Sequence, residues 1–206
     1  PDAARLEKRF GAVCGGSYAA HIEASAISTA VLGLEPSNTL WNDPFADRGF
    51  RNLLNDDLSK MSAAAKTYDK LATRLQKHAK DRSTGDMRFA YLWARAIAER
   101  YGVSAGAVAA YRKGDRKALA KVKEKVPAAA RAWRAAADAF RDMWLAHNKP
   151  DGLEIMQERF GMIDARYKEM QKSLSGYLMG DADCIPELAA PCPPDNKIKN
   201  RKGTRK

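Results

Sequence analysis

The side chains best suited to binding chemistry lie between Trp144 and Arg159. Trp144 offers a large aromatic surface, and Asn148 and Lys149 follow it in an Asn-Lys-Pro turn. Residues 151–154, Asp-Gly-Leu-Glu, begin the next predicted helix. A helix N-terminus beside a lysine forms a positive site that suits a carboxylate or a polarised carbonyl. The segment therefore predicts a docking surface, and the alternative left equally open is that these residues only pack a helix hairpin.

The sequence contains none of the short motifs that mark a catalytic or cofactor site. It has no glycine-rich phosphate loop, no nucleophile elbow and no Cys-x-x-Cys pair. Its three histidines, His21, His78 and His147, are scattered, and three cysteines exclude a four-cysteine zinc site. No Asp-Glu dipeptide occurs anywhere. We therefore predict that the chain holds no catalytic residue, no metal and no cofactor.

The chain is basic, but its charge is unevenly spread. The formal net charge is +11 at pH 7, and residues 195–206 carry six Lys or Arg against one Asp. This end of the chain has no aromatic residue on which a base could stack. We interpret residues 193–206 as a solvated, disordered tail, with weak attraction to an acidic polymer or a membrane surface as the alternative. The longest stretch without Asp, Glu, Lys or Arg, residues 10–22, is too short to span a bilayer, so we predict no membrane span.

Helical periodicity dominates from residue 58 onward. Apolar residues recur every three or four positions over residues 58–79, 86–111, 115–147 and 152–178, a pattern typical of helices with one buried face. Short loops join these segments, so we predict an all-α fold, an antiparallel helical bundle of four long helices. Pro127 predicts a kink or a break in the third helix, and Asp151 with Glu154 predicts an Asp-capped start for the fourth.

The first fifty residues have a different character. They predict a short helix that ends near Phe10, a Gly15-Gly16 turn, a helix over residues 17–31 and an irregular stretch over residues 33–44. Trp41 and the Asx-rich turns indicate a segment that lies against something larger. We therefore divide the chain into an irregular helical segment (1–50), a helical bundle (51–192) and a basic tail (193–206).

Two motifs carry a family resemblance. Residues 140–154, FRDMWLAHNKPDGLE, followed by Arg159-Phe160-Gly161 and Arg166, resemble a stretch near the C-terminus of bacterial exo-β-N-acetylhexosaminidases of glycoside hydrolase family 20. Pro36-Ser37 with residues 40–44, LWNDP, resembles an earlier segment of the same enzymes, and the resemblance covers residues 1–191. The chain departs from the family pattern at Thr39, at residues 45–48 and at Met162.

The resemblance implies a parent enzyme that removes terminal N-acetylglucosamine or N-acetylgalactosamine from glycans, with the acetamido oxygen of the substrate as nucleophile. The catalytic Asp-Glu pair of that family is absent, so the resemblance implies the helical C-terminal domain alone. Its expected partners are the preceding catalytic barrel, a second copy in a homodimer and, through the parent enzyme, the glycan. The candidate interface or pocket-rim residues are Trp41, Trp144, Asn148, Lys149, Glu154, Arg159 and Arg166.

Two alternatives to this reading remain open. One is a freestanding helical protein-interaction module, because a fold alone does not fix a function. The other is a basic nucleic-acid-binding helical bundle, although we predict no nucleic acid as a partner of the domain.

Cys184 and Cys192 bracket a short proline-containing loop, and the family pattern has neither cysteine. Because the chain has both cysteines where the family pattern has neither, we predict a disulfide between them. Such a bond would place the parent enzyme in an oxidising compartment, periplasmic or extracellular. Cys14 is expected to stay free.

Overall fold

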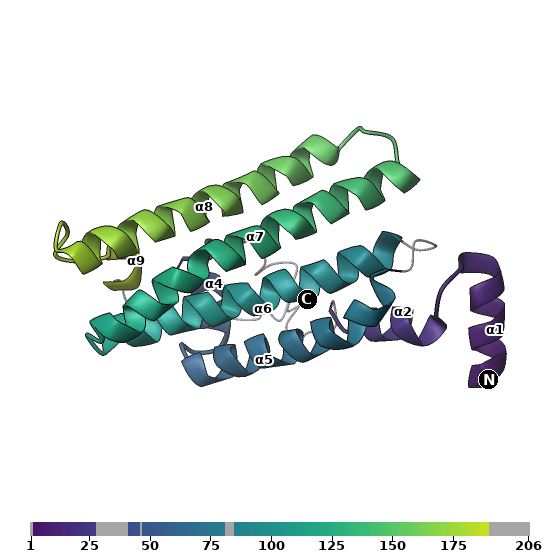
Figure 1. Cartoon of the computed structure of the whole chain (residues 1–206), viewed down its shortest axis with the longest axis horizontal. Coiled ribbons are helices and arrows are strands. Elements are labelled where there is room, and N and C mark those ends of the chain that lie inside the picture. Colours follow the sequence, from purple (N-terminus) through teal and green to yellow (C-terminus); the bar gives the residue numbers. More distant parts are fainter. Residues whose placement is uncertain (1, 28–40, 46, 81–84, 190–206) are drawn as a thin grey trace, which may run out of the picture.

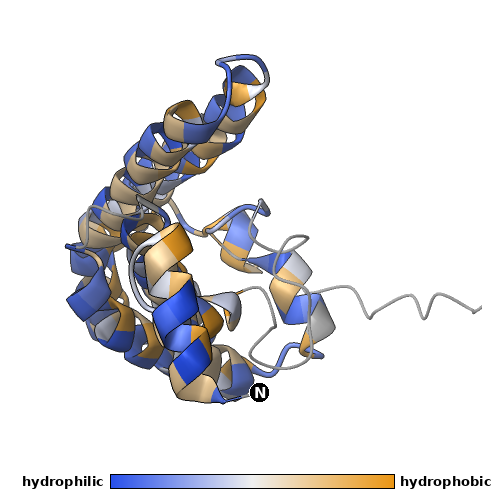
Figure 2. Cartoon of the chain, turned by 90° about the vertical axis from the view of Figure 1, so that its right-hand side faces the viewer, coloured by the Kyte–Doolittle hydropathy of each residue, from blue (hydrophilic) through white to orange (hydrophobic). Residues whose placement is uncertain are grey.

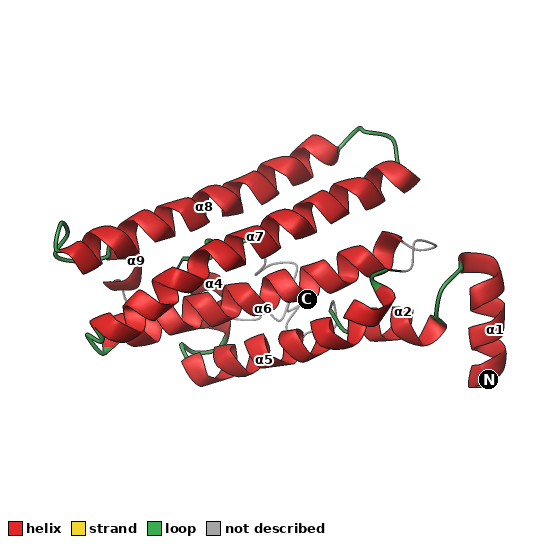
Figure 3. Ribbon diagram, in the orientation of Figure 1, coloured by secondary structure: helices red, strands yellow, loops and turns green. Residues whose placement is uncertain are grey.

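A computed structural model describes residues 2–27, 41–45, 47–80 and 85–189. Within these ranges the regular structure is entirely helical and includes no strand (Figure 3), which confirms the all-α prediction. Within the same ranges, no helix combines the length and the apolar character needed to cross a bilayer. The predicted helical end at 28–31, most of the irregular stretch at 33–44 and the predicted tail at 193–206 lie outside the described residues.

Four long helices follow the four periodic segments closely. They are α5 (Leu58–Leu75), α6 (Gly85–Arg112), α7 (Arg116–His147) and α8 (Leu153–Met179), and a short 3-10 turn, η1 (Gln76–His78), extends α5. Asp57 caps α5 by accepting from the N–H groups of Ser59 and Lys60, and Asp115 caps α7 by accepting from Ala118. These short polar residues satisfy N–H groups that a helix leaves unpaired at its start.

The long helices run in alternating directions, side by side in chain order (Figure 1). The closest packing joins consecutive helices, α5 with α6, α6 with α7 and α7 with α8. Seen from one end, the layer bends into an arc, with shorter segments on its inner side (Figure 2). The four helices thus form a curved row, and the predicted four-helix bundle is not confirmed as an arrangement. The inner helices α6 and α7 each pack between two long helices, whereas the outer helices α5 and α8 have one long neighbour each. The shorter segments therefore pack against the apolar faces that α5 and α8 would otherwise expose.

Two local predictions concern the interior of α7 and the start of α8, and the second is wrong. The helix α7 continues through Pro127 without a break, and Val126, Ala129 and Ala130 on either side of the proline are buried. A kink at Pro127 stays a prediction. The start of α8 is not capped by Asp151. Gly152 occupies the cap position with a left-handed φ of 85°, and no side chain bonds there.

Four short helices complete the described fold: α1 (Ala3–Cys14), α2 (Tyr18–Ser25), α4 (Arg48–Leu53) and α9 (Pro186–Ala189). The first runs four residues beyond the predicted end at Phe10. The Gly15-Gly16 turn is present, and both glycines have positive φ, 72° and 74°, which only glycine adopts without strain. The turn lets α1 stand apart from the row of long helices and contact α2 (Figure 1).

Candidate interface at the hairpin tip and the polar pocket beside it

The tip of the α7–α8 hairpin is held by Trp144. Its indole Nε1–H donates to the carbonyl oxygen of Lys149 over 2.9 Å, and its ring lies 5.7 Å from that of Phe140. The N–H of Asn148 donates to the carbonyl oxygen of Trp144 over 2.7 Å. A Cβ added at Gly152 would lie 3.6 Å from the same indole. Trp144 therefore stabilises the turn through backbone groups of the residues around it.

The other candidates at the tip face solvent. The side chains of Asn148, Lys149 and Glu154 are exposed, and Asn148 and Lys149 bond to Trp144 through their backbone atoms alone. Turn closure therefore does not require these three side chains. They remain available for a partner, beside the N-terminus of α8, where the helix dipole favours negative charge.

Trp41 lies elsewhere, against the middle of the row. Its ring is 5.9 Å from those of Trp93 and Trp133 and 5.3 Å from that of Phe160. The guanidinium carbon of Arg159 lies 5.6 Å from the centre of the Trp41 ring, within the range of a cation–π contact. Trp41 thus joins an aromatic cluster built from α6, α7 and α8, and Arg159 covers its outer face.

Arg166 reaches the same N-terminal segment two turns further along α8. It donates to Asp43 Oδ2 over 2.7 Å and to Glu187 Oε1 over 3.3 Å, and it lies 6.0 Å from the centre of the buried Phe45 ring. The hydrogen bond from Arg166 to Asp43 is the main reason that the pKa of Arg166 lies above its ordinary value. Arg159 and Arg166 therefore both hold residues 41–45 against α8.

A buried ion pair that the sequence reasoning missed anchors this segment from the other side. Arg100 on α6 donates from Nε to Asp47 Oδ2 over 2.9 Å and from the NH2 nitrogen to the carbonyl oxygen of Asn42, also over 2.9 Å. Burial raises the pKa of Asp47, and the positive charge of Arg100 opposes that rise. Ser104, one turn later on α6, donates to the carbonyl oxygen of Pro44. The helix periodicity contained the signal, because Arg100 and Ser104 occupy seam positions between Ile97 and Val108.

A polar pocket of about 590 Å³ opens beside this segment. Its lining includes Asn42, Asp43, Asp47, Arg48, Pro186 and Glu187. The lining combines three carboxylates with the guanidinium group of Arg48. A side chain at Gly49 would collide with Asn42, so the glycine keeps the wall open. Groups of this kind can bind the hydroxyl and amide groups of a ligand or of a partner surface.

The seven candidate residues therefore fall into two groups. Trp144, Asn148, Lys149 and Glu154 lie at the hairpin tip, while Trp41, Arg159 and Arg166 fix residues 41–45 near the polar pocket. No three His, Cys, Asp or Glu side chains in the described part of the chain are placed to hold a metal ion. Cys184 is exposed and Cys192 lies outside the described residues, so the disulfide stays a prediction that the intact mass without reductant can check.

Comparison with known proteins gives one family match. Residues 35–204 match the family described as the glycoside hydrolase 20C C-terminal domain. The match takes in both groups of candidate residues and the polar pocket. A search of curated proteins finds no match.

Proposed function

Because the chain belongs to the family of glycoside hydrolase 20C C-terminal domains, we propose that it braces the catalytic domain of its parent β-N-acetylhexosaminidase. The parent enzyme would remove terminal N-acetylhexosamine residues from glycans, and this domain would contribute no catalytic group of its own. The polar pocket and the hairpin tip would then lie at or near the contact with the catalytic domain.

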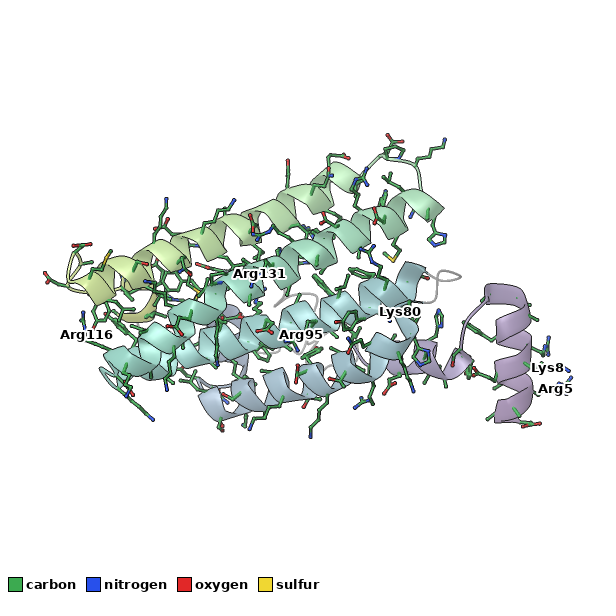
Figure 4. The ribbon with its side chains drawn as sticks, in the orientation of Figure 1. Arg5, Lys8, Lys80, Arg95, Arg116 and Arg131 are labelled. Carbon is green, nitrogen blue, oxygen red and sulfur yellow. The ribbon has the colours of Figure 1, made fainter. Side chains whose placement is uncertain are left out.

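One observation carries the bracing role: α1 has an apolar face that α2 covers only in part, through Phe10 beside Tyr18 and His21. None of its residues is buried, and the described helix that it packs against most is α2. Val13 is 84 % exposed, and Ile22 on α2 is 54 % exposed. Arg5 and Lys8 lie on the far side of α1 from the row of helices (Figure 4). An amphipathic helix with an exposed apolar side is stabilised by a partner, and the catalytic domain is the partner that the family supplies.

The test compares two aspartates placed one residue apart in the last turn of α1. Val13→Asp charges the apolar face, whereas Ala12→Asp places the same charge on an exposed side about 100° around the helix. In the parent enzyme, Val13→Asp should lower the unfolding temperature and Ala12→Asp should not, because only the first buries an unpaired charge against the catalytic domain. In the 206-residue chain both variants should unfold like the wild type. Equal behaviour of the two variants in the parent enzyme would contradict the proposal.

A second role, dimerisation, rests on exposed apolar residues of α7 and α8. Ile155 and Met162 are 53 % and 46 % exposed and lie two turns apart on one side of α8, and Leu145 on α7 is 38 % exposed. Large exposed apolar residues on one helix hairpin are typical of a protein contact. We infer that a second copy covers them in the parent enzyme. Met162→Lys should halve the mass of the parent enzyme in light scattering, and an unchanged dimer mass would contradict this role.

A further inference from the structure

A groove between α7 and α8 lies apart from both candidate surfaces. Its volume is about 320 Å³, at the small end of the range for ligand sites. Val126, Pro127 and Ala130 of α7 form an apolar wall, and Tyr167 of α8 faces them. Burial raises the pKa of Tyr167, so this wall is neutral at physiological pH. The groove thus offers an apolar surface large enough for a single small ring.

The rim of the groove is cationic. Arg131 and Arg134 of α7 and Lys168 of α8 line it, and Arg131 lies midway along α7, next to α8 (Figure 4). Asp164 pairs with Arg134 over 2.7 Å and with Lys168 over 3.0 Å. Partial burial acts to raise the pKa of Asp164, but the hydrogen bonds from Lys168 and Arg134 hold this pKa below its ordinary value. The carboxylate of Asp164 is therefore shared by two cations, and Arg131 has no ion pair within the described residues. The rim of the groove thus carries a net positive charge.

The lining of the groove includes a hydrogen-bond acceptor that has no donor within the described residues. Gln171 lines the groove, and its side-chain oxygen Oε1 is buried with no hydrogen-bond partner within the described residues. Pro127 also removes the N–H that would bond to the carbonyl oxygen of Lys123 one turn earlier. Buried acceptors are nearly always paired in folded proteins, so an unpaired one in a lined groove indicates a donor that a ligand can supply.

We propose that this groove binds a sugar acid, a small ring that carries one carboxylate and several hydroxyl groups. The carboxylate would accept hydrogen bonds from Arg131 and Arg134, whose planar guanidinium groups match its geometry. The C–H face of the ring would pack on Pro127 and Ala130, and one hydroxyl would donate to Gln171 Oε1. The inference concerns a face of the molecule that the proposed bracing role does not use.

Calorimetry with the 206-residue chain at physiological salt tests this, with glucuronate as the probe and glucose as the matched sugar that lacks the carboxylate. We expect saturable binding of glucuronate with a Kd of about 1 mM or tighter, and glucose at least tenfold weaker. Failure of glucuronate to saturate, or equal binding of glucose, would overturn the proposal.

Two variants separate the groove from a general attraction of anions to a basic protein. Arg131→Gln should weaken glucuronate about tenfold by removing one charge-assisted hydrogen bond, whereas Lys117→Gln, at an exposed position of α7 outside the groove, should change the Kd less than twofold. Gln171→Leu should weaken binding about fivefold without lowering the unfolding temperature, because it removes an unpaired acceptor. Equal losses for Arg131→Gln and Lys117→Gln would show non-specific binding and overturn the proposal.

Discussion

The guanidinium group of Arg100 donates to both carboxylate oxygens of Asp47, over 2.9 and 3.2 Å, and neither side chain is exposed to solvent. The two residues are 53 positions apart in the chain. Asp47 also has a left-handed φ of 45° and immediately precedes α4. The pair therefore fixes the N-terminal segment, the start of α4 and the wall of the polar pocket to α6 at a single point.

Breaking this pair on one side should destabilise the domain strongly. Asp47→Asn keeps the size and the tolerance for left-handed φ but leaves Arg100 charged and buried, and we expect a loss of about 3–5 kcal/mol in the free energy of unfolding. Arg100→Met combined with Asp47→Asn should recover most of the loss. Urea denaturation measures both, and a single variant as stable as the wild type would show that the pair is dispensable.

The core face of α8 provides a direct test of the fold. Ile163 is fully buried in the middle of the helix, so Ile163→Asp should lower the free energy of unfolding by several kcal/mol. Ala165→Asp, on the exposed side of the same helix, is the matched control and should stay within about 0.5 kcal/mol of the wild type. Circular dichroism melting curves distinguish the two, and a melting temperature within a degree or two for both would show that this face is not core.

The four long helices could be predicted from the sequence, because each keeps an apolar seam over at least five turns. Strong local signals also mark their boundaries, such as Asp115 at the start of α7 and Gly180 after the end of α8. The fold around residue 47 could not. It depends on ion pairs, in which Arg100 binds Asp47 and both Arg51 and Arg112 bind Asp56. Arg100 and Arg51 are buried, and Arg100 and Arg112 lie far from their partners in the sequence. A search for apolar periodicity passes over a buried arginine, so the short helix α4 and the pocket beside it were not foreseen.

The candidate site could be predicted in part for a similar reason. The sequence marked Trp144, Asn148 and Lys149 as one surface, and these residues do lie together at the hairpin tip. It did not separate them from Arg159 and Arg166, which lie further along α8 and hold residues 41–45. Linear proximity on a 27-residue helix says little about function, because Glu154 is exposed at the hairpin tip while Arg159, five residues later, contacts Trp41.

Stability should fall in acid partly through Asp56. Partial burial acts to raise the pKa of Asp56, but hydrogen bonds from Arg51 and Arg112 keep this pKa below its ordinary value. The stabilisation is therefore complete above the unfolded-state pKa of about 4 and is lost as the pH falls through the lower folded-state value. At pH 7, Asp56→Asn should cost about 2 kcal/mol, and this difference from the wild type should shrink below about pH 4. A difference that stays constant down to pH 2 would contradict this linkage.

The hairpin tip can be tested in the parent enzyme by changing side chains that do not close the turn. Because Asn148 and Lys149 bond to Trp144 through backbone atoms, Asn148→Ala with Lys149→Ala should leave the unfolding temperature unchanged. If the tip is a docking surface, the double variant should lose at least tenfold in kcat/KM, about 1.4 kcal/mol, or fall apart into monomers. The control is Glu169→Ala with Lys172→Ala, two exposed positions further along α8. Unchanged kinetics and mass for the tip variant would leave these residues with hairpin packing alone.

Amide hydrogen exchange of α1 and α2 tests the bracing role most directly, because it compares the same residues with and without the catalytic domain. In the 206-residue chain, residues 3–25 have few buried contacts and should exchange rapidly. In the parent enzyme the same amides should exchange at least tenfold more slowly, while the buried core of α6 and α7 should exchange slowly in both. Equal, rapid exchange of residues 3–25 in the two proteins would contradict the proposal that this surface docks on the catalytic domain.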